Sequence, residues 1–266
     1  MNEAIDSGNT GSEATDLAAA YRRVRQFTER LYAPLSAEDC VIQSMPDASP
    51  TRWHLAHTTW FFETFVLARD DRYRPFDPAY AYLFNSYYNT VGEQFPRPQR
   101  GMLSRPGLDE IRRYRDHVDD RMHAVMESLV GSDVALAGVI ELGLHHEQQH
   151  QELILTDIKH VLAQNPLRPI YRTGGPDRHR EIGDGWSEFP EGIAWVGHAG
   201  EGFHYDNEAP RHRVFHEAFA LQNRPVTASE YLEFKQQGGY QNPEYWLSLG
   251  WQTVSREGWT APLYWV

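Results

Sequence analysis

The stretch Leu144-His145-His146-Glu147-Gln148-Gln149-His150-Gln151-Glu152 decides how the first part of this sequence folds. Within it, His146 and His150 are four residues apart, a spacing that places both imidazoles on one face of a helix, about one turn from each other. Two imidazoles in this arrangement can bind the same metal ion. The sequence therefore predicts a helix that contributes two metal ligands.

This helix is predicted from Asp133 to Gln164, with Ser132 as its N-cap and Pro166 beyond its end. One side of it should face a core, because its residues recur at alternating intervals of three and four. That side consists of Leu136, Val139, Gly143, His146, His150, Leu153 and Asp157. Polar groups in a core need partners, and a metal ion would satisfy both imidazoles.

The third ligand is expected on a second helix, predicted at 50–67. This helix carries two candidates, His54 and His57. His57 shares a face with Trp53, whereas His54 has Phe61 nearby, so periodicity does not decide between them. Three neutral imidazoles leave coordination positions open, which is typical of a catalytic site, and they suit zinc and iron alike.

The remaining helices are predicted at 13–31 and 108–129. The second helix is expected to begin with Ser49 as its N-cap and Pro50 in the first helical position, because serine and proline favour these positions. Four long helices with connections of this kind predict a four-helix bundle.

Composition changes after the bundle: a stretch rich in Gly, Pro, Arg and Asp is followed by short apolar runs with turns between them, which favours a mixed α/β domain. The predicted segments are a disordered leader (1–12), a helical bundle with a metal site (13–165), a linker (166–190) and a second, partial domain (191–266). Within the bundle, the long connection at 70–106 is rich in Tyr and Phe, so we predict an ordered substrate-binding loop.

Bulk composition narrows the function classes. The formal net charge of −12 disfavours nucleic acid and anionic membranes as partners. A single cysteine, Cys40, excludes a disulfide framework and a zinc site built on several thiolates. The N-terminus does not resemble a signal peptide, and no apolar run is long enough to span a membrane. A cytoplasmic protein is therefore expected.

Several motifs together resemble a known family. Ser49-Pro50-Thr51-Arg52-Trp53-His54-Leu55-Ala56-His57-Thr58, with His146-x3-His150-x-Glu152, resembles the DinB-like domain of the sulfoxide synthases of ergothioneine biosynthesis (EgtB-type). The stretches at 203–212, 225–232 and 238–240 resemble the opening of a formylglycine-generating-enzyme (sulfatase-modifying factor) domain, which has a C-type-lectin-like fold. The resemblance implies a DinB-like four-helix bundle followed by the incomplete start of such a domain.

The resemblance also implies a chemistry. Members of this family are non-haem iron(II) enzymes that use O2 to join the sulfur of cysteine or γ-glutamylcysteine to the imidazole C2 of hercynine, giving a sulfoxide. Their three iron ligands correspond to His57, His146 and His150 of this sequence. The glutamine before the last ligand, here Gln149, is expected to contact the ammonium region of hercynine.

Further site residues are expected around these ligands. Arg97 and Arg100 resemble the family's clamp for the carboxylate of the thiol substrate, which suits the bidentate pairing of arginine with carboxylates. Glu152 is two residues from His150, which turns it away from the shared face, so we predict that it orients a ligand from behind. The family's catalytic tyrosine is expected beyond residue 266, so the sequence is interpreted as C-terminally truncated.

Alternative functions share the same bundle. One is a zinc-dependent DinB-like thiol transferase or hydrolase, another is an ovothiol-type synthase that uses histidine in place of hercynine, and a third is a non-catalytic metal-binding remnant. A formylglycine-generating activity is disfavoured, because that chemistry needs cysteines in the second domain and none follows Cys40.

Overall fold

In a computed structural model of the protein, residues 10–129, 133–174 and 184–265 are described. The chain divides into two compact units, Met1–Thr173 and Gly174–Val266, and each is described by itself. Within the described residues, no helix combines the length and the apolar character needed to cross a membrane.

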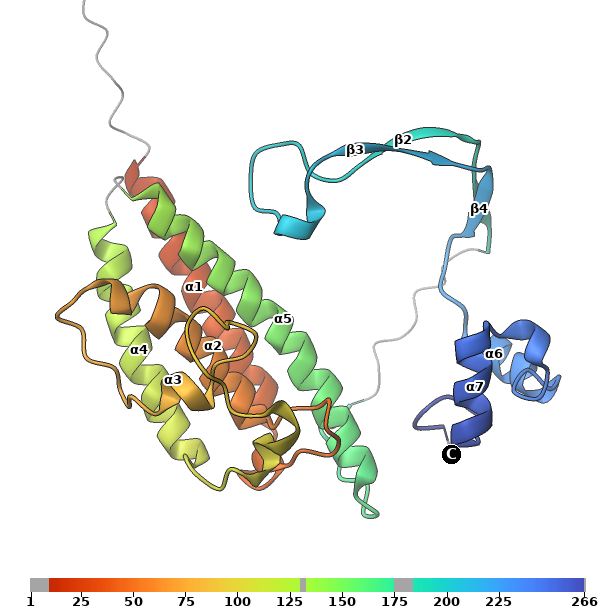
Figure 1. The fold of residues 1–266 in the computed structure, drawn as a ribbon, viewed down its shortest axis with the longest axis horizontal. Coiled ribbons are helices and arrows are strands. Elements are labelled where there is room, and N and C mark those ends of the chain that lie inside the picture. The colour runs from red at the N-terminus through yellow and green to blue at the C-terminus, as the bar shows by residue number, and fades with distance from the viewer. Residues whose placement is uncertain (1–9, 130–132, 175–183, 266) are drawn as a thin grey trace, which may run out of the picture. The chain divides into compact units, whose positions relative to one another are not determined.

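The first unit is a bundle of long helices (Figure 1). Its helices are α1 (Thr10–Tyr32), α2 (Thr51–Phe65), α4 (Leu108–Ser128) and α5 (Val134–Gln164). Helix α2 packs against both α4 and α5, and α1 also packs against both of these helices. The predicted four-helix bundle is therefore confirmed.

Helix α2 occupies the middle of this bundle. Every residue from Thr51 to Glu63 is buried, which is expected of a helix surrounded by others rather than lying on a surface. The approach of α5 is close: a Cβ atom added to Gly143 would lie 2.5 Å from the ring of Phe62 and 2.8 Å from that of Phe61. A glycine at this position therefore lets α5 approach α2 one turn before His146.

The ends of two helices differ from the sequence prediction. Helix α1 begins at Thr10, so the last residues of the predicted leader (1–12) are helical, and residues 1–9 lie outside the described part. Helix α2 begins at Thr51, with Pro50 as its N-cap residue and no side-chain cap. Ser49 was expected to cap this helix, but its hydroxyl accepts a hydrogen bond from Arg100 instead.

The start of α5 also shifts by one residue. Asp133 is the N-cap, and its carboxylate accepts a hydrogen bond from the backbone N–H of Leu136 at 2.9 Å. The predicted cap, Ser132, lies outside the described residues. Within the predicted inward side of the helix, Leu153 is a further correction, because it is 42% exposed while its neighbour Ile154 is buried.

The connection between α2 and α4 is ordered, as predicted. It contains the short helix α3 (Tyr80–Leu83) and two 3₁₀ helices, Leu67–Arg69 and Arg97–Met102. The buried side chain of Asn85 holds one of its turns by donating to the backbone oxygen of Gly92 at 3.0 Å. A role in substrate binding stays a prediction at this point.

The second unit combines short strands and helices. Its elements are β1 (Trp186–Phe189), β2 (Gly192–Val196), β3 (His212–His216), β4 (Phe219–Gln222), α6 (Ala228–Gln236) and α7 (Ser248–Glu257). Strand β1 pairs antiparallel with β4, and β2 pairs antiparallel with β3, so the described residues of this unit form two separate two-stranded sheets. The mixed composition agrees with the prediction, whereas the likeness to a formylglycine-generating-enzyme domain stays a prediction.

Candidate metal centre

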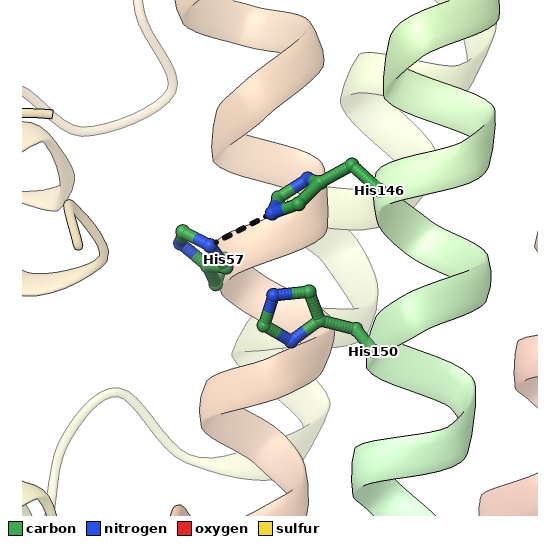
Figure 2. Close-up of side chains that lie close together, drawn as sticks. All are labelled: His57, His146 and His150. Atoms are coloured by element: carbon green, nitrogen blue, oxygen red, sulfur yellow. Dashed lines mark hydrogen bonds between the residues drawn. The ribbon is translucent and has the colours of Figure 1, made fainter. Parts of the chain in front are cut away.

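The structure brings His57 of α2 together with His146 and His150 of α5 (Figure 2). One ring nitrogen from each lies within 4.8 Å of the others, so the three side chains could hold a single metal ion. His57 is 2% exposed, whereas the two histidines of α5 are half-buried. The cluster therefore lies at the edge of the core, with His57 buried and the two histidines of α5 partly exposed to solvent.

Hydrogen bonding orients the His57 ring. Its Nδ1 lies 2.6 Å from the backbone oxygen of Phe84, and because a carbonyl only accepts, Nδ1 carries the proton and donates. The lone pair of Nε2 then faces Nε2 of His146 at 3.1 Å. Two nitrogens bound at ~2.1 Å and at right angles on one metal ion would lie ~3 Å apart. The spacing of these two imidazoles therefore fits adjacent ligands of a metal ion.

His54, the alternative candidate on α2, does not join the cluster. Its Nδ1 lies 2.8 Å from Nδ1 of His150, and its Nε2 lies 3.0 Å from a carboxylate oxygen of Asp157. The structure thus places His57 among the cluster residues and His54 behind His150.

Aromatic rings enclose the cluster. Trp53 stacks on His57 with ring centroids 4.6 Å apart, Trp60 stacks with the same imidazole at 5.7 Å, and Phe61 lies 5.0 Å from His146. This wall excludes water from one side of the site, which strengthens electrostatic interactions there.

The surroundings keep the three imidazoles neutral. Burial lowers the pKa of His146 to about 4 and holds the pKa values of His57 and His150 well below the usual range. For His57 and His150, the nearby imidazoles and the Arg100 guanidinium add to this effect. Neutral imidazole is the form that binds a metal, so the site is prepared for binding at neutral pH.

Arg100 lies beside this site as a buried cation. Its guanidinium carbon is 3.3 Å from the ring centre of Trp53, and its nitrogens donate to the hydroxyls of Ser49 at 2.9 Å and Ser86 at 3.0 Å. In the described part of the chain, Nε of Arg100 is buried without a hydrogen-bond partner, and no carboxylate pairs with this guanidinium. Burial lowers its pKa to about 9, with the charge of Arg97 acting in the same direction, so it remains charged at neutral pH.

Arg97 lies on the same 3₁₀ helix but is less buried. Its guanidinium donates to the hydroxyl of Tyr87 at 3.0 Å and to the backbone oxygen of Asp47. Tyr87 is 75% exposed and adopts a left-handed backbone conformation with φ of 64°, which is uncommon for a residue with a bulky side chain. The two arginines therefore lie on one short element, one buried and one near solvent.

Two predicted site residues lie at the exposed side of α5. Gln149 is exposed directly before His150, and no hydrogen bond of its side chain is present among the described residues. Glu152 is also exposed, and within the described residues its backbone oxygen, not its carboxylate, accepts a hydrogen bond from the hydroxyl of Thr156. A role of Glu152 behind a ligand therefore stays a prediction, whereas the structure shows the carboxylate of Asp157 behind His150, through His54.

Sequence reasoning missed a buried ionic network next to the cluster. Glu147, which lies between His146 and His150 in the sequence, is fully buried. It accepts hydrogen bonds from Arg25 at 2.9 Å, Arg115 at 3.2 Å and Thr28 at 2.6 Å. Burial alone would raise the pKa of Glu147, but the two guanidinium groups hold it at about 2. A signal was present: Arg115 follows Ile111 by four residues and precedes Val118 by three, which places it on an apolar helix face.

Comparison with known proteins shows relatives over most of the chain. The sequence is 30% identical over 256 residues to a hercynine oxygenase of Mycobacterium tuberculosis, covering 94% of this chain and 57% of that protein. Hercynine oxygenases of Mycolicibacterium thermoresistibile and Mycolicibacterium smegmatis are 29% and 28% identical, covering 83% and 95% of this chain and 48% and 56% of their own lengths. These relatives confirm the family resemblance drawn from the sequence. The chain spans about half the length of the relatives it matches.

The family match covers the part of the chain that holds the histidine cluster. The DinB superfamily matches residues 20–154, which include most of the four-helix bundle and His57, His146 and His150. This match spans more than half of the 266 residues. The chain therefore belongs to the DinB superfamily.

Proposed function

We propose that this chain carries the iron(II) site and the thiol-substrate clamp of a hercynine oxygenase-type sulfoxide synthase of ergothioneine biosynthesis. The reaction joins the sulfur of cysteine or γ-glutamylcysteine to C2 of hercynine with O2. One observation carries the proposal: a neutral three-histidine cluster lies beside a buried arginine that lacks a carboxylate partner among the described residues. The names of the relatives over most of the chain support the same assignment.

In this proposal His57, His146 and His150 are the metal ligands. The iron would supply binding of O2 and the redox chemistry, because three neutral imidazoles leave positions open for O2 and a thiolate. Phe84 keeps Nδ1 of His57 protonated, so that Nε2 presents its lone pair to the metal. The residues of the chain thus fix the ligand nitrogens before the metal arrives.

Arg100 and Arg97 would bind the carboxylate of the sulfur donor. A buried guanidinium without an anionic partner is costly, and a substrate carboxylate would supply that partner. Arg100 contacts the ring of Trp53, and Trp53 stacks on the proposed ligand His57. A donor held by Arg100 would therefore lie within a short distance of the metal, where its sulfur can react.

Hercynine carries a trimethylammonium group, which aromatic rings attract through their faces. Tyr88 packs against Trp60 at 5.5 Å and Phe61 at 6.3 Å, next to the histidine cluster. Gln149, directly before the ligand His150, is proposed to contact the same ammonium region. The second unit is proposed to be the start of a formylglycine-generating-enzyme-like domain, and no residue of this sequence is assigned as the catalytic tyrosine.

The test is anaerobic reconstitution of the full chain with Fe(II), followed by metal analysis and then addition of hercynine, O2 and either sulfur donor. We expect one Fe(II) per chain, loss of that metal in His146→Ala, and a sulfoxide adduct by mass spectrometry that identifies the donor. Arg100→Gln should retain the metal but weaken use of the donor, by a raised KM. A chain that binds no iron would contradict the proposal.

The zinc alternative is decided in the same experiment. A chain that retains Zn(II) but rejects Fe(II), and that transfers or hydrolyses a thiol substrate without O2, would replace the oxygenase assignment by a zinc-dependent DinB-like activity. One Fe(II) per chain without a sulfoxide adduct would leave the metal site in place and remove the synthase activity from this chain.

A further inference from the structure

Behind His150, the side chains of His54 and Asp157 form a chain of hydrogen bonds that reaches the histidine cluster. Nδ1 of His150 lies 2.8 Å from Nδ1 of His54, and Nε2 of His54 lies 3.0 Å from Oδ2 of Asp157. His54 is 2% exposed and Asp157 is 7% exposed, so water does not compete for these bonds. The three groups follow one another from carboxylate to imidazole to imidazole.

We infer that His54 and Asp157 are positioning residues for the metal ligand His150, whose tautomer and ring orientation they fix. The inference rests on the proposed function in one respect, namely that His150 binds the metal. One positioning residue comes from each of two helices, His54 from α2 and Asp157 from α5. Neither residue is a ligand itself.

The carboxylate of Asp157 determines which nitrogen of His54 and of His150 carries the proton. A carboxylate oxygen accepts hydrogen bonds, so Nε2 of His54 donates to Asp157 and carries the proton. A neutral imidazole has one N–H, and therefore Nδ1 of His54 is left with its lone pair. That lone pair accepts from Nδ1–H of His150. Nε2 of His150 is then unprotonated and free to bind a metal.

The opposite order of protons is unfavourable at both ends. If Nδ1 of His54 donated to His150, the lone pair of Nε2 would face the carboxylate oxygen of Asp157 at 3.0 Å. Nε2 of His150 would then carry the proton and could not bind the metal. Asp157 is itself held in place, because the same Oδ2 accepts the backbone N–H of Ser49 at 2.8 Å.

The arrangement also ties this metal ligand to the proposed substrate clamp. Ser49 donates its backbone N–H to Asp157, and its hydroxyl accepts a hydrogen bond from Arg100. The residue before Pro50 is thus fixed between the carboxylate that orients His54 and the buried guanidinium. This double use explains why Ser49 does not cap α2.

The inference is tested with Co2+ as the probe metal, on the full chain prepared without metal. Metal ligands that lose such supporting partners bind metal ~10–100-fold more weakly. We therefore expect His54→Phe and Asp157→Leu to raise the Kd for Co2+ by ~10–100-fold and to alter its visible absorption. Asp157→Asn keeps an oxygen acceptor for His54 and should restore at least part of the affinity.

His160→Phe is the matched control. His160 is a buried histidine of α5 whose Nδ1 lies 2.6 Å from the hydroxyl of Ser44, and it is not part of the histidine cluster. Loss of its imidazole should leave the Kd for Co2+ within a few-fold of the wild-type value. An equal loss of affinity in this control and in His54→Phe would overturn the inference, because it would indicate a general effect of removing a buried imidazole.

A second measurement does not depend on how the variants fold. In the metal-free wild-type chain, 1H–15N correlation spectra of the imidazoles should show His150 protonated at Nδ1 and His54 protonated at Nε2. Protonation of His150 at Nε2 would overturn the inference. If the wild-type chain binds Co2+ and both variants bind it with the same affinity, the inference is overturned while the proposed metal site remains. If the wild-type chain binds no metal, both the inference and the proposed metal site are ruled out.

Discussion

At the scale of single residues, Cys40 shows how burial determines reactivity. It is the only cysteine of the chain and is 0% exposed. Burial, with a smaller contribution from the neighbouring carboxylate of Asp39, raises the pKa of its thiol to about 12. Because the thiolate is the nucleophile, we expect almost no labelling by a disulfide reagent in the folded protein at pH 8, and complete labelling in urea. Rapid labelling of the folded chain would contradict this burial.

The same shift predicts a dependence of stability on pH. The thiol pKa rises from 9.0 in the unfolded chain to about 12 in the folded one, so above pH 9 the unfolded chain releases a proton that the folded chain retains. The contribution of Cys40 is therefore complete below pH 9 and is lost as the pH rises towards 12. Urea unfolding at pH 8 and pH 10 should show this loss, and Cys40→Ala should show a smaller one.

Residue spacing predicted the cluster residues of α5 but not all of their neighbours. His146 and His150 share a face because they are four residues apart. Glu152 follows His150 by two residues, a rotation of about 200° along a helix, and its side chain is exposed, so its role behind a ligand stays a prediction. Asp157 follows His150 by two turns and was already on the predicted inward side. Its partner His54 lies on another helix, and periodicity along one segment cannot reveal a contact between two.

At the scale of helices, Gly143 controls how closely α5 approaches α2. A Cβ at this position would meet the rings of Phe62 and Phe61 at 2.5 and 2.8 Å, so the helices would have to separate just before His146. We expect Gly143→Ala to lower the free energy of unfolding by about 1–3 kcal/mol and to weaken metal binding. Unfolding in urea and Co2+ titration measure the two effects.

Gly138 provides the control on the same helix. Nothing lies within 4 Å of a Cβ added there, and the residue is exposed. Gly138→Ala should raise the free energy of unfolding by up to about 1 kcal/mol, because alanine favours helix more than glycine does. If both substitutions stabilised the protein equally, the close contact at Gly143 would not determine the spacing of the helices.

The ionic network around Glu147 joins three of the four long helices. Arg25 of α1 and Arg115 of α4 both donate to this carboxylate of α5, and all three side chains are buried. Glu147→Gln leaves Arg25 and Arg115 with one carboxylate partner each, the more exposed Asp119 and Glu29, so it should lower the free energy of unfolding by up to about 3–5 kcal/mol. Asp70→Asn, which breaks the exposed pair with Arg72, should change it far less, because water and salt screen an exposed ion pair. Thermal and urea unfolding distinguish the two cases.

Sequence patterns predicted the presence of the long helices better than their ends. A helix buried on every side, such as α2, follows from its run of apolar and aromatic residues. Its cap could not be predicted, because Ser49 forms its hydrogen bonds with Asp157 and Arg100, which come from distant segments. The charge network was missed for the same reason: Glu147 appears in the sequence as one of many polar residues of α5, and its partners belong to α1 and α4.

At the scale of the whole molecule, the two units differ in how much apolar surface they bury. The bundle has a contiguous core of buried side chains, whereas the strands of the second unit leave Trp195 58%, Phe215 59% and Leu221 58% exposed. Two-stranded sheets are marginally stable in water on their own. We therefore expect amide hydrogens of β2 and β3 to exchange much faster than those of α2, which should open only with global unfolding of the bundle.

Hydrogen exchange followed by mass spectrometry on the full chain tests this difference, and a second experiment with added metal tests it further. All three cluster histidines belong to the first unit, so a ligand that binds only the folded bundle stabilises that unit and leaves the other unchanged. Zn2+ should therefore slow exchange in α2 and α5 without slowing it in β2 and β3. Equal protection of strands and helices, or an equal response to Zn2+, would contradict the expectation that the strands open without unfolding of the bundle.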